Sequence, residues 1–320
     1  MTSLKERIGA VSPAWLVRAY RAAAAGREFF RDYTQYVTSS SWYDQPNERR
    51  GWRDSAESYQ SRLTINYHGL EKGSTFPSPK RPYGASKIIA IEKLLNNADQ
   101  QSINVSARSH AMSAVDATIA FNETGVISHQ ISPSVTSAPP IWNGAAFRAF
   151  TAARHSIRNF DAERPVDDII IREAVTTATE GTPSVCNRRS YRAHYYSDRK
   201  SIDALLDLQN GNRGFGHTVQ GLFVVTQRRS SFVGPGERNQ RWIDGGLFAM
   251  TLVFSLHSLG LGTCFLNWSQ TNARTDSLRE RGRIPRDEDI IVLIAVGYPP
   301  ASYRVASSPA RPLSETYVQH

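Results

Sequence analysis

The sequence predicts a mixed α and β fold built around one sheet. Three observations lead to this prediction. The second half alternates helix-patterned segments with short runs rich in β-branched residues, whereas the first 140 residues combine helical patterns with stretches punctuated by Gly and Pro. With 320 residues the chain also exceeds the usual size of a single hydrophobic core, so two structural regions are expected.

The N-terminal region is expected to be mainly helical and rich in loops. Pro13 followed by the Ala- and Arg-rich residues 14–37 indicates one or two helices. Residues 39–84 are polar and interrupted by Gly and Pro, which predicts a long structured loop, and residues 85–98 return to helical spacing. Residues 128–140, rich in Ser and Pro, are interpreted as a connector.

The connector sets the predicted division of the chain into an N-terminal extension, residues 1–144, and a second domain, residues 145–320. Within the extension, residues 60–90 are expected to form a loop that is unusually long for a compact protein. Long loops of this kind are usually functional, so the segment is predicted to form a lid at the edge of the active site. As a lid, it would offer His68, Glu71 and Lys72 as polar contacts to a substrate; a solvated turn is the alternative for this segment.

The second domain supplies the predicted sheet and the helices that flank it. Helical spacing continues through residues 147–153. The elements that follow are a helix at 169–179, a strand at 191–196, a helix at 201–208, a strand at 222–226, an apolar helix at 246–259 and a β-rich run at 289–298. Gly260 and Gly262 are expected to end the apolar helix. That helix is apolar nearly all round, so several of its faces should be buried.

Composition and charge exclude several classes of function. A formal charge of +9 favours anionic ligands, yet no zinc-finger, RNP or basic-helix pattern indicates nucleic acid. The longest apolar run, residues 290–296, is far shorter than the ~20 residues of a membrane span. Cys186 and Cys264 stand far apart without a CxxC motif, so neither a disulfide framework nor a zinc site is expected and a cytoplasmic protein is predicted. No Walker loop or GxGxxG fingerprint is present.

The main candidate binding residues form a compact basic cluster. Arg154, His155, Ser156, Ile157 and Arg158 supply two guanidinium groups, an imidazole and a hydroxyl within five residues, which suits a phosphate or an electron-rich ring edge. A solvated basic turn is the alternative. His257 and Cys264 are expected to be packing residues, because no metal partner or activating base lies at suitable spacing.

The cluster opens an ordered series of motifs. RHSIRNF at 154–160 is followed by PSVCN at 183–187, GNRGF at 211–215, GLGTCFLN at 260–267, IAVGYP at 294–299 and RPL at 311–313. In this order and spacing, residues 145–320 resemble the nitroreductase superfamily. The resemblance implies a nitroreductase-like mixed sheet flanked by helices, FMN bound without a covalent bond, and a homodimer whose sites take residues from both subunits.

The resemblance also assigns site residues. Arg154 and Ser156, with the neighbouring His155, match the segment that holds the FMN phosphate and ribityl chain, Arg158 matches a basic residue near the pyrimidine edge, and Arg311 matches a C-terminal phosphate ligand. Pro183, Ser184 and Asn187 match a segment that reaches the flavin from the partner subunit, and Asn267 ends the backbone stretch that faces the hydride-accepting ring nitrogen.

Two departures from the family pattern concern substrate choice and affinity. Arg188 and Arg189 stand where the family often has Gln, which is expected to add charge near the flavin or the substrate entrance. Residues 308–310 lack the Lys that commonly precedes the last Arg. A finer resemblance, carried by the HGLEKG segment at 68–73 and by Asn267-Trp268, is to a subgroup associated with surface polysaccharide biosynthesis.

The sequence therefore predicts an FMN-dependent oxidoreductase that passes hydride from NAD(P)H to a small organic acceptor. The alternatives are a flavin-dependent dehydrogenase or a flavin-modifying enzyme on the same scaffold, and a non-catalytic binding protein in polysaccharide assembly. The physiological acceptor, the preferred nicotinamide and the role of residues 1–144 are left open.

Overall fold

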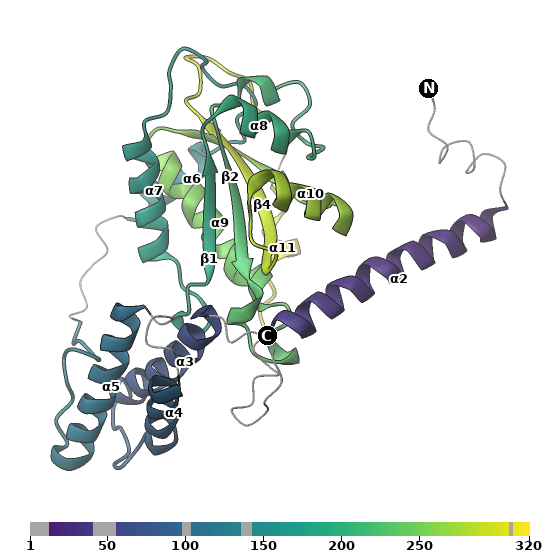
Figure 1. Cartoon of the computed structure of the whole chain (residues 1–320). Helices are drawn as coiled ribbons and strands as arrows, with labels where there is room; N and C mark the ends of the chain where they lie inside the picture. Colours follow the sequence, from purple (N-terminus) through teal and green to yellow (C-terminus); the bar gives the residue numbers. More distant parts are fainter. Residues whose placement is uncertain (1–12, 41–55, 98–103, 136–142, 307–309) are drawn as a thin grey trace.

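A computed structural model describes residues 13–40, 56–97, 104–135, 143–306 and 310–320. The second half is built on a four-stranded antiparallel sheet (Figure 1). Its strands, in spatial order, are β1 (Tyr191–Tyr196), β2 (Gly221–Arg228), β4 (Glu288–Gly297) and β3 (Gly262–Asn267). The three strands predicted from sequence are confirmed, and β3 joins them at the edge beyond β4.

Alternating residues of β2 serve two different cores. Leu222 and Val224 belong to the core between the sheet and helices α8 (Arg199–Leu206) and α10 (Asn272–Gly282). Phe223 and Val225 belong to the core against α7 (Asp168–Gly181) and α9 (Gln240–Ser258). Because successive side chains of a strand point to opposite faces, β2 is covered on both sides. This explains why its sequence is a continuous apolar run.

Helix α9 is the principal helix on its face of the sheet. Phe248, Leu252 and Leu256 are fully buried or nearly so, as the apolar sequence predicts. The helix begins at Gln240, six positions before the predicted start, because its first turns carry polar residues whose partners lie elsewhere in the fold. Gly260, in a left-handed conformation, follows its last turn.

The N-terminal region is helical, with α2 (Ala14–Ser39), α3 (Ala56–Ser74), α4 (Ala85–Asn97) and α5 (Val105–Thr124). Helices α3 to α5 enclose a small separate core that includes Leu63, Leu70, Ile91 and Ala111. The predicted loop at 39–84 is wrong over most of its described residues, because α3 occupies 56–74. Residues 75–84 are the non-helical remainder, and 41–55 lie outside the described residues.

Helices α2 and α3 both contact the second half. Helix α2 is one continuous helix whose C-terminal part lies on α10, where Arg31 pairs with Asp276 and the Glu28 carboxylate accepts the backbone N–H of Asn272 at 2.8 Å. Helix α3 lies against the short helices η2 (Val185–Asn187) and η4 (Arg229–Ser231). The remaining elements are α6 (Gly144–Ala153), α11 (Leu313–Thr316), η3 (Gly216–Thr218) and η5 (Pro235–Glu237).

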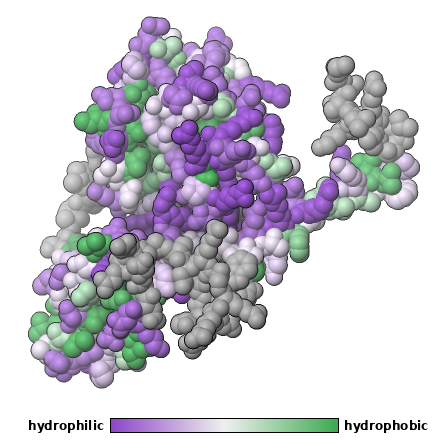
Figure 2. All heavy atoms as spheres, viewed as in Figure 1, coloured by the Kyte–Doolittle hydropathy of each residue, from purple (hydrophilic) through white to green (hydrophobic). Residues whose placement is uncertain are grey.

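Part of the predicted connector, residues 136–140, lies outside the described residues, and the boundary at residues 144 and 145 stays a prediction. None of the described helices is long and apolar enough to cross a membrane. The N-terminal part of α2 projects away from the rest of the chain (Figure 1), and hydrophobic residues along it are left uncovered in the space-filling view (Figure 2). Trp15 and Phe29 of α2 are both exposed.

Candidate functional site

The basic cluster runs beside the start of β3. The backbone N–H of Ile157 donates to the carbonyl of Thr263 at 2.9 Å, and Ser156 forms a parallel bridge with the same residue. The Ile157 side chain is buried and lies so close to Gly262 that a Cβ there would approach Ile157 Cγ1 to 2.8 Å. Gly262 therefore lets the cluster pack directly on the strand. The structure brings together the RHSIR and GLGTC motifs, which the sequence places about a hundred residues apart.

The cationic side chains around this contact border a small cavity of about 130 Å³. Arg154 and His155 line it together with His257, at the C-terminal end of α9, and Tyr303. Burial lowers the pKa of His257, and the nearby Arg154 and His155 lower it further against a backbone hydrogen bond at Phe150. His257 is thus kept neutral, and its ring packs 4.9 Å from that of Phe150, in agreement with the packing role predicted for it.

Cys264 lies on the inner side of the same contact. Its side chain is buried, and burial raises the pKa of the thiol although Arg158, Ser156 and Arg154 act in the opposite direction. A raised pKa keeps the sulfur protonated and poorly nucleophilic. This agrees with the expectation that Cys264 fills space in the core.

The guanidinium groups of Arg154 and Arg158 are not neutralised within the described part of the chain. Neither forms an ion pair with a described carboxylate, Arg158 is exposed and Arg154 is half-buried. Ser156 is also half-buried beside them. The cluster is therefore a set of donors with unsatisfied positive charge, which is the composition that an anion requires.

The second predicted segment, Pro183 to Asn187, turns sharply between α7 and β1. Cys186 and Asn187 both have positive φ, of 50° and 53°. The turn is fixed by the Asp244 carboxylate, which accepts the backbone N–H of Val185 at 3.1 Å, and by Ser184 Oγ, which accepts the backbone N–H of Arg189 at 2.8 Å. Asp244 is buried, and this burial raises the pKa of its carboxyl group.

Arg188 does not add free charge to the site, which corrects the sequence-based expectation. Its guanidinium is buried, forms two hydrogen bonds with the Glu237 carboxylate at 2.8 and 2.9 Å, and also donates to the carbonyl of Ser231. The left-handed backbone that precedes it turns its side chain inward. Arg189, by contrast, is exposed.

The two predicted segments lie at opposite ends of α9 in one chain. The Pro183 segment is held by Asp244 near the start of the helix, and the basic cluster surrounds His257 at its end. Thirteen residues of α-helix correspond to roughly 20 Å. A single chain therefore does not bring these residues into one cavity.

Two further predicted residues lie apart from the cluster. Asn267 ends β3, where its exposed side chain donates to Ser269 Oγ at 3.1 Å and its carbonyl accepts from Gln209. Arg311 lies in the exposed C-terminal segment, and its described ion pair is with Glu315 at 3.7 Å. The structure does not join either residue to Arg154.

A polar group beside Asn187 was recognised only in part from the sequence. Glu71 on α3 pairs with His68 at 3.2 Å and with His110 of α5 at 2.5 Å, and Asn187 Nδ2 lies 3.4 Å from His68 Nδ1. His68 and Glu71 were candidates from sequence, whereas His110 was missed. It sits in a helix that the sequence analysis did not assign, with no local motif to indicate it.

The comparisons with known proteins bear on the second half of the chain. No curated protein shows significant similarity. Among solved structures, the chain is similar to an FMN-dependent nitroreductase from Clostridium difficile, with 18% identity over 53% of this chain and 98% of that one and a TM-score of 0.45. It is also similar to a nitroreductase-like protein from Streptococcus mutans, with 15% identity over 55% and 98% and a TM-score of 0.48. Residues 204–298, from α8 through β4, match the model of the Nitroreductase family.

Proposed function

We propose that this protein is an FMN-dependent oxidoreductase that transfers hydride from NAD(P)H to a small organic acceptor. The observation that carries the proposal is the basic cluster, packed on β3 with the guanidinium groups of Arg154 and Arg158 unneutralised in the described chain. The match of residues 204–298 to the Nitroreductase family supports the same assignment from a different part of the sequence.

The residues of the cluster fit the chemistry of FMN. Arg154, His155 and Ser156 would bind the phosphate and ribityl chain, as donors of charge-assisted hydrogen bonds. Arg158 would lie near the pyrimidine edge and stabilise negative charge there. When bound, FMN would supply the two-electron chemistry by accepting hydride from NAD(P)H and delivering it to the acceptor. Arg311, on the exposed C-terminal segment, stays in the proposal as a further phosphate ligand.

The proposal includes a homodimer, for two reasons. The cavity at the basic cluster, about 130 Å³, is smaller than the 300 Å³ or more of ordinary ligand pockets, so one chain does not enclose the ligand. Pro183, Ser184 and Asn187 lie roughly 20 Å away along α9 and would reach the flavin of the partner. The backbone that leads to Asn267 would face the hydride-accepting ring nitrogen. Each site is then assembled from both chains.

We also propose a cytoplasmic location, from the two widely separated cysteines, and a connection with surface polysaccharide biosynthesis, from the finer sequence resemblance. That resemblance rests on residues 68–73, which are part of α3, and on Asn267-Trp268. It suggests a biological context and changes none of the chemistry proposed above.

The first test of the proposal is flavin binding by the full-length protein. After reconstitution, we expect about one FMN per subunit to remain bound through gel filtration. Arg154→Ala removes a charge-assisted contact of about 1.5 to 3 kcal/mol and should weaken FMN binding by more than about tenfold, measured by flavin fluorescence. Arg148→Ala, on the exposed surface of α6, is the matched control. Protein that retains no FMN, or equal affinities of the two variants, would contradict the proposal.

A further inference from the structure

A second cavity, of about 400 Å³, lies away from the basic cluster, between α2, α10, the start of α9 and the start of β4. Its volume falls within the range of small-molecule sites. Residues of α2 form one wall, and residues that follow β3 form another. Nothing in the proposed flavin chemistry uses this cavity.

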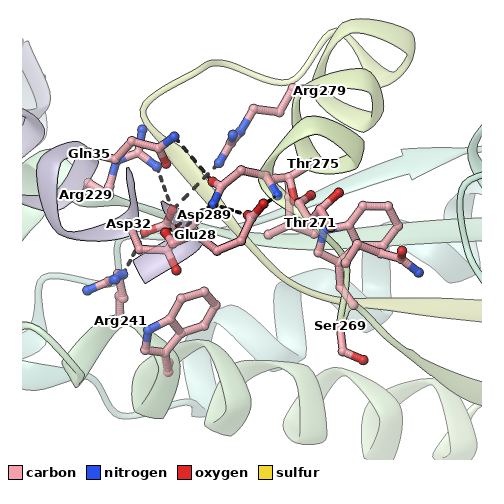
Figure 3. A pocket seen from close by; sticks show the side chains of 15 residues that line it. Glu28, Asp32, Gln35, Arg229, Arg241, Ser269, Thr271, Thr275, Arg279 and Asp289 are labelled. Carbon is pink, nitrogen blue, oxygen red and sulfur yellow. Dashed lines mark hydrogen bonds and ion pairs between the residues drawn. The ribbon is translucent and has the colours of Figure 1, made fainter. Parts of the chain in front are cut away.

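Three arginines converge on one carboxylate at the base of the cavity (Figure 3). Asp289 lies 2.6 Å from Arg229 Nη1, 2.7 Å from Arg241 Nε and 3.7 Å from Arg279 Nη2. All three guanidinium groups are at least nine-tenths buried. Asp276 also pairs with Arg279, at 3.3 Å, but this half-exposed carboxylate is shared with Arg31.

Three guanidinium groups at the base therefore face one buried carboxylate, whereas Glu28 and Asp32, the two other carboxylates that line the cavity, belong to α2. Burial lowers the pKa of Arg279, and the positive charge of Arg229 lowers it further, although the carboxylates of Asp289 and Asp276 act in the opposite direction. Arg229 Nε is buried and has no hydrogen-bond acceptor in the described chain. An uncompensated buried cation is costly, so an added anion at this place would be stabilising.

The opposite wall carries the complementary groups. Glu28 and Asp32 of α2 face the same space (Figure 3), and the side-chain amide of Asn272 donates to them at 2.8 and 3.0 Å. Trp242 and Trp268 also line the cavity. The cavity thus has cations at its base, carboxylate acceptors on the α2 wall and two aromatic rings in its lining.

We propose that this cavity binds a small organic anion that also carries hydroxyl groups, of the class of the hydroxy acids. Its carboxylate pairs with Arg229 and Arg241 at the base, and its hydroxyl groups donate to Glu28 and Asp32. Because α2 supplies the acceptors, bound ligand ties α2 to the body of the protein.

Malate, inorganic phosphate and the neutral polyol erythritol, titrated into the full-length protein by calorimetry, test the proposal. Malate should bind, phosphate should bind more weakly, and erythritol should not bind. Arg241→Gln should weaken malate by about tenfold or more, as expected for loss of a charge-assisted hydrogen bond. Arg238→Gln, an exposed arginine nearby that does not line the cavity, should leave the affinity unchanged.

A second variant keeps the test decisive if Arg241→Gln does not fold. Asp32 is exposed, so Asp32→Ala should be tolerated. It should weaken malate binding, because a hydroxyl acceptor is lost, and should tighten phosphate binding, because a negative charge is removed. Saturating FMN, or Arg154→Ala, should leave malate binding unaffected. Absence of malate binding up to about 10 mM, equal effects of Arg241→Gln and Arg238→Gln, or displacement of malate by FMN would overturn the proposal.

Discussion

Glu288 shows how a buried carboxylate is stabilised by residues far away in the sequence. It lies at the start of β4 with 1% of its side chain exposed. Burial alone would raise its pKa, but His194 Nε2 at 2.6 Å, Thr226 Oγ1 at 2.5 Å and the charge of Arg192 outweigh burial, so the pKa is lowered. Strand pairing places these residues together, since Thr226 lies on β2, the strand next to β4, and His194 lies on β1, one strand further across the sheet.

A lowered pKa in the folded state means that ionised Glu288 stabilises the fold above the ordinary pKa of about 4.5, and that this contribution is lost as pH falls through the folded value. Glu288→Gln should therefore lower the free energy of unfolding at pH 7 by about 1 to 3 kcal/mol, with a difference from wild type that shrinks in acid. Urea unfolding at pH 7 and at several values below 4.5 measures both effects. A difference that is constant with pH would show that the charge does not matter.

Residue identities predicted the cluster at 154–158 better than they predicted its surroundings. A run of donors without an acidic neighbour is visible in the sequence, and the ordered motifs link it to the 260–267 segment that it contacts. The ion pair of Arg188 could not be predicted from the sequence. Its partner Glu237 is 49 positions away, and the backbone turn before Arg188 decides which way its side chain points. Pairing of this kind is a property of the fold.

At the scale of elements, α3 was missed because its glycines look like loop residues. In the structure they allow close helix packing: a Cβ at Gly69 would meet the Lys87 side chain, and one at Gly73 would meet the ring of Tyr83. Helix α10 was missed for a different reason, since its polar sequence has little apolar periodicity and it is fixed by its Thr271 cap and by contacts with α2. Elements with long apolar sequences, such as β2 and α9, were predicted, although α9 begins six positions before its predicted start.

Gly73→Ala tests this packing. Alanine would raise intrinsic helix propensity by about 1 kcal/mol, but Tyr83 is held in place by Ser74 at 2.5 Å and by the Leu70 carbonyl at 3.0 Å, so its ring cannot yield easily. We expect a net loss of about 1 to 3 kcal/mol in unfolding free energy. Gly26→Ala in α2, where nothing lies within 4 Å, should be neutral or stabilising by up to about 1 kcal/mol. A stabilised Gly73→Ala variant would refute the packing explanation.

Helix α3 also contains His68 and Glu71, two residues of the segment predicted to form a lid. Residues 60–90 are mostly helical rather than a loop, yet His68 of α3 lies 3.4 Å from Asn187, a residue of the proposed flavin site. Changing both His68 and Glu71 to Ala should leave FMN content and subunit association intact while altering the rate at which acceptors reoxidise the reduced protein. Lys93→Ala, at an exposed position of α4, is the control. Rates unchanged across acceptors of different size would favour the alternative of a solvated surface feature.

At the scale of the whole molecule, the single chain covers some faces of its sheet and helices and leaves others exposed. The sheet is buried on both faces, and α3 to α5 have a core of their own. Helix α9 is covered on the side that meets the sheet, whereas Ile243 and Leu247 stay exposed on the other side. The sequence could show that α9 is apolar nearly all round, but not which face the single chain would leave open, because that depends on how α7 and the sheet pack.

The exposed face of α9 therefore predicts how two chains associate. Exposed apolar residues at helical spacing are typical of a stable interface, and the two halves of the proposed flavin site lie at opposite ends of the same helix. The wild-type protein should sediment as a dimer. Leu247→Asp places a charge on this face and should yield monomers that also lose FMN, since each site would lack the partner's Pro183 segment. Ile169→Asp, on the exposed side of α7, makes the same chemical change elsewhere and should leave the dimer and its flavin intact. A monomeric wild type that holds a full complement of FMN would show that one chain completes the site, and the roughly 20 Å separation of its two halves along α9 would then need a different explanation.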